Sequence, residues 1–356
     1  MRVIQVLTTL AYGDAIGNET LALKDTIKRL GYSTGIYAEN IDNRIIDKEV
    51  KYVNELPKLS EEDVIIYHLA IKTDLNYQLK DYPCKKIIIY HNITPSEFFI
   101  GYNENSRRNC EEGLKEAKIL ASYADYCLAV SEFNKKDLLA MGYKCPIDIL
   151  PILITFKDYE KKPNQKVLNR YNDDYVNILF TGRIAPNKKQ EDIIDAFYYY
   201  NKFINPKSRL FLVGSFGGME KYYYKLKEYS KQLGLKNVYF TGHIGFDEIL
   251  AYYKVADLFL CMSEHEGFCV PLVEAMYFNL PIVAYDSSAI ADTLGGSGFL
   301  LKEKNGKETA EVIHRILSDE KLKNTIVYNQ KIRLQDFQHD VIENEFIRYL
   351  NKFLGK

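Results

Sequence analysis

The chain has 356 residues, with 47 basic and 48 acidic side chains and a net charge of −1. This length favours two domains, and the balanced charge gives no electrostatic reason to expect a nucleic-acid partner. No segment approaches the roughly 18 uninterrupted apolar residues of a membrane helix. The six cysteines show no C-x-x-C spacing, so we expect reduced thiols in a cytoplasmic protein, with peripheral attachment to the inner face of the membrane left open.

The first half of the chain alternates short apolar runs with longer amphipathic segments, which is the pattern of a parallel α/β sheet. Helices are predicted over Glu19–Leu30 and Glu111–Tyr123. The predicted strands are Arg2–Thr8, Ser33–Ala38, Val64–His68, Lys86–His91, Tyr126–Val130 and Ile147–Leu150.

This alternation stops at residues 155–174, which are charged and contain Pro163, so a linker or a surface excursion is predicted there. A second α/β pattern follows, with a helix over Gln190–Tyr200 and helical spacing from Leu334 to the end of the chain. Its predicted strands are Val176–Gly182, Arg209–Gly214, Asn237–Gly242, Asp257–Met262, Pro281–Tyr285 and Gly298–Lys302. Two parallel sheets in tandem explain the chain better than one large sheet, and ligands are expected at the carboxyl ends of the strands.

Two predicted strand-to-helix loops carry groups suited to anions. Gly13, Asp14, Gly17 and Asn18 form one of them, although a tight turn with Asn18 as N-cap explains this loop about equally well.

In the other loop, Gly182 precedes Arg183 and Lys188, two cations five residues apart. The forked guanidinium of Arg183 and the compact ammonium of Lys188 suit a diphosphate whose negative charge grows as a bond to it breaks. The alternative interpretation is that both are ordinary solvated surface charges.

A histidine follows the fourth predicted strand. His91 is a candidate for a hydrogen bond to a ligand, and His68, also at a strand end, competes with it. A structural histidine is the more common case. Ser131 and Glu132 follow the fifth strand, where a helix cap is the safer interpretation.

The stretch EHEGFCVPLVE at residues 264–274 places two carboxylates around a predicted helix start. Pro271 suits the first helical position, Val270 before it should be extended, and Glu274 should fall in the first turn. Acids that only complement the helix dipole are the alternative. Glu264 has no assigned partner and is interpreted as a surface acid.

The motif E-G-F-x-x-P-x-x-E-A-M, from Glu266 to Met276, resembles the E-x7-E motif of the retaining family 4 glycosyltransferases. The order of the other motifs along almost the whole chain supports this resemblance. It implies the GT-B architecture, in which two Rossmann-like domains with parallel sheets face a central cleft. The implied domains are an acceptor-binding domain at 1–155, a nucleotide-sugar donor domain at 156–335 and a C-terminal helix at 336–356 that returns to the first domain.

The resemblance also implies roles for single residues on the donor side. Arg183 and Lys188 would bind the diphosphate and stabilise it as leaving group, and Glu274 would accept hydrogen bonds from the ribose hydroxyls. Glu266 would meet the hydroxyls of the transferred sugar. The remaining implied donor contacts come from backbone groups of Gly182, His243, Ile244, Gly267, Phe268 and Cys269.

On the acceptor side, the resemblance places His91 near the sugar and the loop from Gly13 to Asn18 near the phosphates or the acceptor. The implied reaction is transfer of a sugar from a nucleotide diphosphate-sugar, UDP- or GDP-linked, to a hydroxyl of a glycan, cell-surface polysaccharide or glycolipid. No cofactor and no metal are expected, because no D-x-D motif is placed to hold Mg²⁺ and Asp173-Asp174 lies in a turn.

Departures from the family pattern are Asn279, where glycine is usual, Asp292, where glutamate is commoner, and the glycine loop itself. Three alternatives remain open. They are a nucleotide-sugar epimerase of the same architecture, an NAD-dependent dehydrogenase, which the missing G-x-G-x-x-G disfavours, and an inactive sugar-nucleotide-binding partner subunit.

Overall fold

The computed structural model describes residues 1–356 and divides into two compact units. Unit 1 comprises Met1–Ser96, Asn105–Phe156 and Asp336–Lys356, and unit 2 comprises Glu97–Glu104 and Lys157–Gln335. The chain therefore enters unit 2 briefly after its fifth strand, and its C-terminal helix belongs to unit 1.

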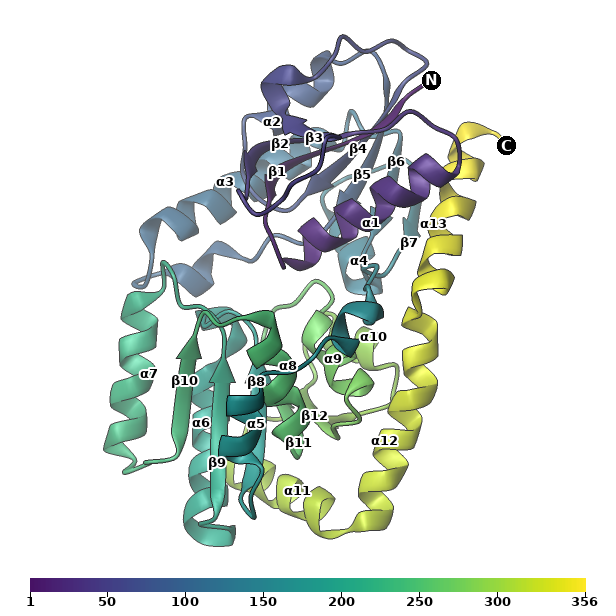
Figure 1. Ribbon diagram of the computed structural model, residues 1–356. Coiled ribbons are helices and arrows are strands. Elements are labelled where there is room, and N and C mark those ends of the chain that lie inside the picture. The colour runs from purple at the N-terminus through teal and green to yellow at the C-terminus, as the bar shows by residue number, and fades with distance from the viewer. The chain divides into compact units, whose positions relative to one another are not determined.

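Unit 1 is built on a seven-stranded sheet of parallel strands in the order β3-β2-β1-β4-β5-β6-β7, with helices packed against it (Figure 1). Its elements are β1 (Val3–Leu10), α1 (Ala15–Arg29), β2 (Ile36–Ile41), β3 (Val50–Tyr52), β4 (Val64–Leu69), α2 (Leu75–Gln78), β5 (Lys85–Tyr90), α3 (Glu104–Leu120), β6 (Tyr126–Ala129), α4 (Glu132–Ala140), β7 (Ile147–Ile149) and α13 (His339–Leu354).

Unit 2 is built on a six-stranded parallel sheet in the order β10-β9-β8-β11-β12-β13. Its elements are α5 (Gln165–Tyr171), β8 (Val176–Thr181), α6 (Gln190–Tyr199), β9 (Ser208–Val213), α7 (Glu220–Gln232), β10 (Val238–Gly242), α8 (Phe246–Val255), β11 (Leu258–Cys261), α9 (Val270–Tyr277), β12 (Ile282–Tyr285), α10 (Ile290–Leu294), β13 (Phe299–Leu301), α11 (Gly306–Ser318) and α12 (Glu320–Leu334). The expectation of two tandem parallel α/β sheets is confirmed.

The central strands are buried on both faces. All six residues of β4 and all four of β11 are buried, as parallel sheets covered by helices require. This explains why these strands form continuous apolar runs and were predicted within one or two residues of their observed ends. The short strand β3 was missed, because its three half-buried or exposed residues carry no apolar run.

Helix α13 packs beside α1 in unit 1, and Figure 1 shows it close to the C-terminal end of α1. Glu343 accepts a hydrogen bond of 2.6 Å from the Thr26 hydroxyl and also pairs with Arg29. Farther along, Lys352 Nζ donates to Asp148 at 2.9 Å, and the Phe353 ring stacks on Tyr126. The C-terminal segment is thus an integral part of unit 1.

The predicted linker at residues 155–174 is largely folded, so that expectation was wrong. The amide side chain of Asn164 caps α5, and its Nδ2 donates to Asp247 on α8 at 2.8 Å. Asp173 forms a forked pair with Arg209 at 2.6 and 2.8 Å. These polar contacts made the segment look like a solvated excursion in the sequence, although it packs against unit 2.

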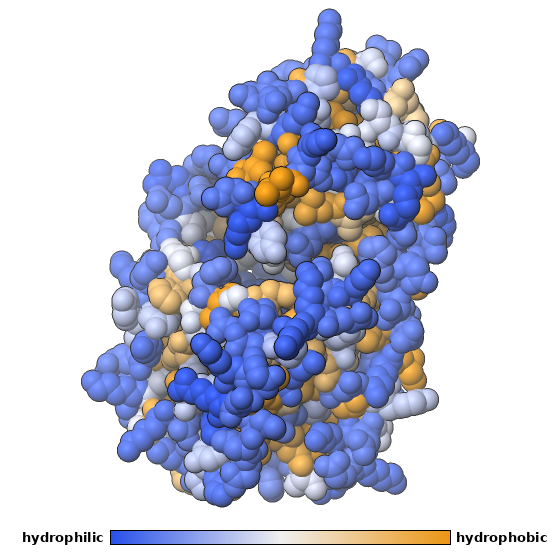
Figure 2. Space-filling model, in the orientation of Figure 1, coloured by the Kyte–Doolittle hydropathy of each residue, from blue (hydrophilic) through white to orange (hydrophobic).

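None of the helices is both long and apolar enough to cross a membrane. Figure 2 shows one face of the chain, on which hydrophilic side chains predominate and apolar ones form separate small groups. All six cysteines are free.

Candidate functional site

In unit 2, the charged motifs meet where the strand order reverses. The chain passes from β8 to β9 on one side and later to β11 on the other, so β8 and β11 flank a topological switch point. Arg183 and Lys188 follow β8, and Glu266 and Glu274 follow β11. Ligands of open α/β sheets bind at this place, outside the carboxyl ends of the strands.

Glycines let the loops after β8 and β9 approach each other. A Cβ atom on Gly214 would lie 2.0 Å from the carbonyl oxygen of Gly182, so only glycine fits there. Arg183 then reaches across, and its Nη2 donates to the Gly217 carbonyl at 3.0 Å. The loop after β9 is therefore a neighbour of the diphosphate candidate Arg183, and no motif in the sequence had indicated this.

Lys188 and Glu266 form an ion pair within this edge of the sheet. The Lys188 side chain is 21% exposed and that of Glu266 is 9% exposed. Burial opposes the charge on Lys188, but the adjacent Glu266 carboxylate raises the pKa of the ammonium above its ordinary value. Two residues 78 positions apart in the sequence are thereby joined, with the cation still partly accessible.

Further bonds hold the loops after β8 and β11 together. The Glu264 N–H donates to the Asn187 carbonyl at 2.8 Å, and Asn187 Nδ2 donates to the His265 carbonyl at 3.1 Å. The Glu266 N–H donates to the Ser288 hydroxyl at 2.8 Å. These contacts fix the backbone on both sides of the Lys188–Glu266 pair.

Glu264 is not an unpaired surface acid, so that interpretation was wrong. Its carboxylate accepts from Lys304 Nζ at 2.8 Å and lies 3.3 Å from Lys189. Burial raises its pKa, but Lys304 and Lys189 together hold the pKa below its ordinary value. The lysine at 304 is 40 residues away in the sequence, so no local pattern reveals the pair.

Helix α9 begins one residue earlier than expected, at Val270 rather than Pro271, after Cys269 in the left-handed conformation with φ 74°. Val270 is therefore the first helical residue and not an extended one. As a result Glu274 lies beyond the first turn, which contains no acid. Because the dipole effect fades within the first turn, complementing the helix end does not account for Glu274.

Glu274 is held by two tyrosines. Tyr253 on α8 donates a hydrogen bond of 2.6 Å to one carboxylate oxygen, and Tyr159 donates one of 3.0 Å to the other. Burial raises the pKa of Glu274, and the two hydroxyl donors partly offset that effect. Each oxygen keeps a lone pair for another donor. Tyr159 comes from the segment predicted to be a linker, which is why it was missed as a site residue.

The remaining donor-side candidates lie on loops of unit 2. Gly267, Phe268 and Cys269 lead into α9, and the Phe268 carbonyl accepts a hydrogen bond from Thr293. His243 is exposed and Ile244 half-buried in the connection between β10 and α8.

In unit 1, the glycine loop turns earlier than expected. Asp14, and not Asn18, is the N-cap residue, and Gly17 lies inside the first turn of α1. A Cβ on Gly17 would lie 2.3 Å from the Ala11 carbonyl oxygen, so this glycine is required by packing. Gly13, with φ 76° and open space around it, is the glycine that shapes the exposed turn.

Ser131 caps α4, and its hydroxyl accepts from the Asn134 N–H at 3.1 Å, which confirms the cap interpretation. Asn279 adopts φ 59°, a left-handed conformation that asparagine tolerates better than most residues. The departure from glycine at this position is therefore accommodated by the backbone.

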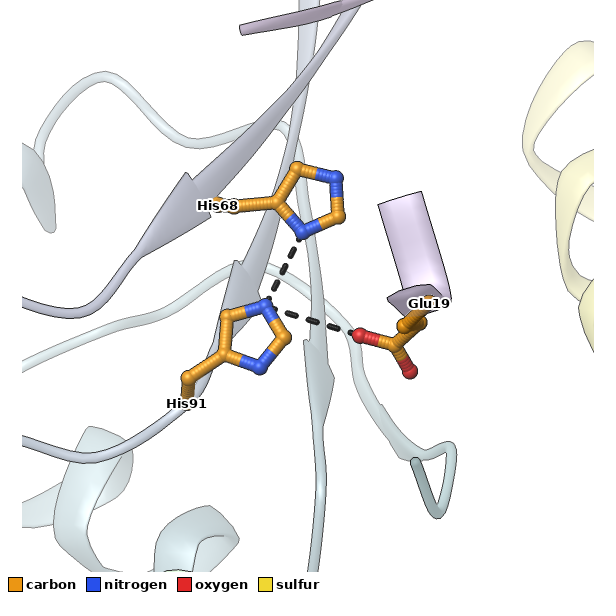
Figure 3. Close-up of side chains that lie close together, drawn as sticks. All are labelled: Glu19, His68 and His91. Atoms are coloured by element: carbon orange, nitrogen blue, oxygen red, sulfur yellow. Dashed lines mark hydrogen bonds and ion pairs between the residues drawn. The ribbon is translucent and has the colours of Figure 1, made fainter. Parts of the chain in front are cut away.

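His91 and His68 do not compete; they form one cluster with Glu19 (Figure 3). His68 Nδ1 lies 2.9 Å from His91 Nε2, and the rings stack with centroids 5.2 Å apart. Glu19 Oε2 is 3.6 Å from the same His91 nitrogen. Burial raises the pKa of Glu19 to about 8, because no nearby cation stabilises the ionised carboxylate. Burial also lowers the pKa of His91 to about 3, because it disfavours the protonated ring.

Two groups of side chains have the donor types that metal ions accept, with ligand atoms within 4.8 Å of one another. In the first, Glu19, His68 and His91, the two ring nitrogens are at hydrogen-bond distance. In the second, Cys261, Glu266 and Cys269, the carboxylate is already paired with Lys188. Hydrogen bonds and an ion pair therefore account for the close approach of these groups.

The whole chain superposes on solved two-domain α/β enzymes. Sucrose-phosphate synthase from Thermosynechococcus elongatus matches with a TM-score of 0.78 at 16% identity over all of both chains. HepE from Anabaena, solved in complex with UDP and glucose, matches with a TM-score of 0.78 at 21% identity, over 99% of this chain and 100% of that one. The fold is therefore the GT-B fold, two Rossmann-like units with the charged switch point of unit 2 described above.

Sequence comparison gives the same kind of protein. Residues 161–333, which lie in unit 2, match the model described as glycosyl transferases group 1. CapM, a capsular polysaccharide biosynthesis glycosyltransferase of Staphylococcus aureus, is 27% identical over 199 residues, 54% of this chain and 50% of that protein. The alpha-monoglucosyldiacylglycerol synthase of Acholeplasma laidlawii is 30% identical over 171 residues, 48% of this chain and 42% of that protein. The chain thus spans about half the length of these curated relatives.

Proposed function

We propose that the chain is a retaining glycosyltransferase that moves a sugar from a nucleotide diphosphate-sugar to a hydroxyl acceptor. The observation that carries this proposal is the pairing of Lys188 with Glu266 at the switch point of unit 2, with Arg183 on the same loop as Lys188. The match of residues 161–333 to the model of glycosyl transferases group 1 supports it independently.

Arg183 and Lys188 bind the diphosphate in this proposal. The charge on the leaving phosphate increases as its bond to the sugar breaks, and fixed cations favour that change. N–H groups around Gly267, Phe268 and Cys269, which lead into α9, add donors to the diphosphate.

Glu274 accepts hydrogen bonds from the ribose hydroxyls, and its two tyrosine partners hold the carboxylate in one orientation. Glu266, which pairs with Lys188, accepts hydrogen bonds from hydroxyls of the transferred sugar. The backbone at Gly182, His243 and Ile244 receives the nucleotide.

In the reaction, the bond from the anomeric carbon to the diphosphate oxygen breaks and a bond to the acceptor oxygen forms. The acceptor hydroxyl loses its proton, and the departing phosphate takes it. This route needs no enzyme nucleophile and no metal, since Arg183 and Lys188 supply the positive charge. Retention of configuration and metal independence are therefore part of the proposal.

We assign His91 a hydrogen bond to the ligand, and the segment from Gly13 to Asn18, which comprises the exposed turn and the start of α1, a place near the phosphates or the acceptor. A UDP- or GDP-linked donor is proposed, because a solved relative in fold contains UDP and glucose. A polysaccharide or glycolipid acceptor is proposed from the functions of CapM and the diacylglycerol synthase. A cytoplasmic location, with peripheral contact at the inner face of the membrane, is proposed to go with such an acceptor.

The first experiment is a thermal-shift screen of UDP, GDP, ADP and CMP, followed by incubation with the radiolabelled sugar of the base that binds. Labelled sugar transferred to an acceptor fraction, with release of nucleoside diphosphate, supports the proposal. An altered sugar still on its nucleotide indicates an epimerase, and binding without turnover indicates a partner subunit; either result contradicts it.

Two further measurements test the finer claims. Activity should survive treatment with EDTA, and a loss of activity that Mg²⁺ or Mn²⁺ restores would contradict metal independence. Proton NMR of the first product formed should show the anomeric configuration of the donor, and the opposite configuration would rule out retention.

A further inference from the structure

A buried chain of polar groups runs across three neighbouring strands of unit 1. Gln5 lies on β1, His68 on β4, and His91 directly after β5. Gln5 is 0% exposed, His68 is 2% exposed and the His91 side chain is 1% exposed. Water therefore does not decide which atoms of these side chains carry protons, and their neighbours must.

The chain of polar groups starts at a backbone carbonyl, which fixes the orientation of Gln5. Gln5 Nε2 donates to the Thr20 carbonyl at 2.8 Å, so the amide oxygen is the atom that faces His68 Nε2 at 3.0 Å. An amide oxygen can only accept. His68 Nε2 must therefore carry a hydrogen.

The Thr20 hydroxyl also requires a hydrogen on His68 Nε2. It donates to the Ile16 carbonyl at 2.7 Å, so a lone pair of its oxygen is available to His68 Nε2, 3.4 Å away. Two acceptors thus surround this ring nitrogen, and they exclude the other tautomer of a neutral His68.

The tautomer of His68 determines that of His91. With its hydrogen on Nε2, His68 presents a lone pair at Nδ1, which lies 2.9 Å from His91 Nε2 (Figure 3). His91 Nε2 must then be the donor. In a neutral imidazole the other nitrogen, Nδ1, keeps its lone pair. His91 Nδ1 is buried and has no hydrogen-bond partner.

Glu19 is compatible with a neutral ring. Its Oε1 accepts from the Leu153 N–H at 3.2 Å, and its Oε2, also without a hydrogen-bond partner, lies 3.6 Å from His91 Nε2. Burial raises the pKa of Glu19 and lowers that of His91, so the carboxyl and the ring are both neutral near pH 7.

We propose that Gln5 and His68 are positioning residues that hold His91 in the Nε2–H tautomer, so that its Nδ1 lone pair accepts a hydrogen bond from a ligand hydroxyl. The hydroxyl belongs to a sugar if the proposed function holds, and the inference about the ligand rests on that function. A buried acceptor of this kind discriminates against ligands that lack the hydroxyl, because its lone pair then stays unpaired.

The tautomer is tested by ¹⁵N NMR of the full chain labelled at histidine, with the His91 signals assigned by their loss in His91→Asn. We expect His91 Nδ1 in the unprotonated range and Nε2 in the protonated range at pH 7. A protonated Nδ1 overturns the inference whether or not the chain transfers sugar. Stoichiometric metal at the cluster, measured by elemental analysis, also overturns it.

Two variants at position 68 separate positioning from packing. The Oδ1 of His68→Asn can replace the Nδ1 acceptor, whereas His68→Leu fills space without accepting. We expect His68→Leu to leave His91 without a single tautomer and to lower kcat/KM about 10-fold, which is the scale of one hydrogen bond to a ligand hydroxyl. We expect His68→Asn to keep the single tautomer of His91 and near-normal kcat/KM. Equal reductions in both variants, while His314→Leu on the exposed face of α11 stays normal, contradict the positioning role.

The ligand is tested with UDP and UDP-glucose, or with the guanine pair if the screen selects that base. UDP-glucose should shift the His91 Nδ1 signal in the direction of an accepted hydrogen bond, and UDP alone should not. Equal shifts with both overturn the assignment to a sugar hydroxyl. Absence of sugar transfer, with Nδ1 unprotonated and shifted by UDP-glucose, contradicts the proposed function and supports the acceptor role of Nδ1.

Discussion

The two units bury acidic side chains in opposite ways. In unit 2, Glu266 lies against Lys188, and both side chains of this ion pair are largely buried. In unit 1, Glu19 is fully buried beside two histidines with no lysine or arginine pairing with it, and the pKa of its carboxyl rises to about 8.

The buried acid of unit 2 thus has a cation as its partner, whereas the buried acid of unit 1 has none. Burial disfavours the ionised form of a carboxyl group, and in unit 1 no opposite charge offsets this effect. A site that binds a diphosphate needs fixed positive charge, whereas a site that accepts one hydroxyl hydrogen needs a neutral lone pair. Each unit has the electrostatics suited to one of these tasks.

The largest effect is expected on the pH dependence of stability, from Glu19→Gln, which removes the titrating carboxyl group of Glu19 from unit 1. Between the unfolded pKa of 4.5 and the folded pKa of about 8, the unfolded chain releases a proton that the folded chain retains. Stability from Glu19 is therefore fully present below pH 4.5 and is lost as the pH rises towards 8, by up to about 4 kcal/mol. Denaturant titrations at about pH 5, 6.5 and 8 measure the free energy of unfolding.

His91 changes the free energy of unfolding with pH in the opposite direction. Its pKa is lowered from 6.5 to about 3, so its contribution is lost as the pH falls through this range. Glu19→Gln should therefore gain stability relative to the wild type on going from about pH 5 to pH 8. A constant difference between the two proteins across these pH values would show that Glu19 is ionised in the folded chain.

The next effect concerns the cations of unit 2. Changing Arg183 or Lys188 to Ala should lower turnover ~10²-fold or more, which is the scale of losing a donor to developing negative charge. Steady-state rates at saturating donor measure the effect. Lys207→Ala is the matched control, because it removes an exposed lysine from its pair with Asp174. Near-normal turnover in both site variants would remove their assigned role.

A smaller effect is expected at the nucleotide. Glu274→Gln keeps the shape but removes the charge, so nucleotide affinity should fall ~10-fold, as for the loss of a charged hydrogen-bond acceptor. Isothermal titration calorimetry measures it. Glu264→Gln, which changes an acid of the same stretch paired with Lys304, should bind normally. Unchanged affinity in Glu274→Gln would leave this carboxylate with a structural role only.

The smallest effect is expected from Tyr253→Phe, which removes one of the hydroxyls that orient Glu274. The carboxylate keeps Tyr159 as a donor, so nucleotide affinity should fall by only about 3-fold, as for one neutral hydrogen bond. The same calorimetric titration detects it. A reduction as large as that of Glu274→Gln would mean that the tyrosine itself binds the nucleotide.

Much of the fold was predictable from local pattern. Buried parallel strands are short apolar runs, so most of them could be found, including β4 and β11 with every residue buried. The segment at residues 155–174 could not, because its contacts with α8 and Arg209 are between polar groups far apart in sequence. The same limit hid Tyr159 as a partner of Glu274.

The sequence by itself determined the residue types of the candidate site and their positions after strands. Arg183, Lys188, Glu266 and Glu274 could be chosen because charged residues at strand ends are visible without coordinates. The tertiary structure decided which of these groups pair, and which groups of unit 1, such as Glu19 and His91, are neutral. Those properties depend on burial and on partners far apart in the chain, such as Lys188 with Glu266 and Gln5 with His68, and no local pattern records them.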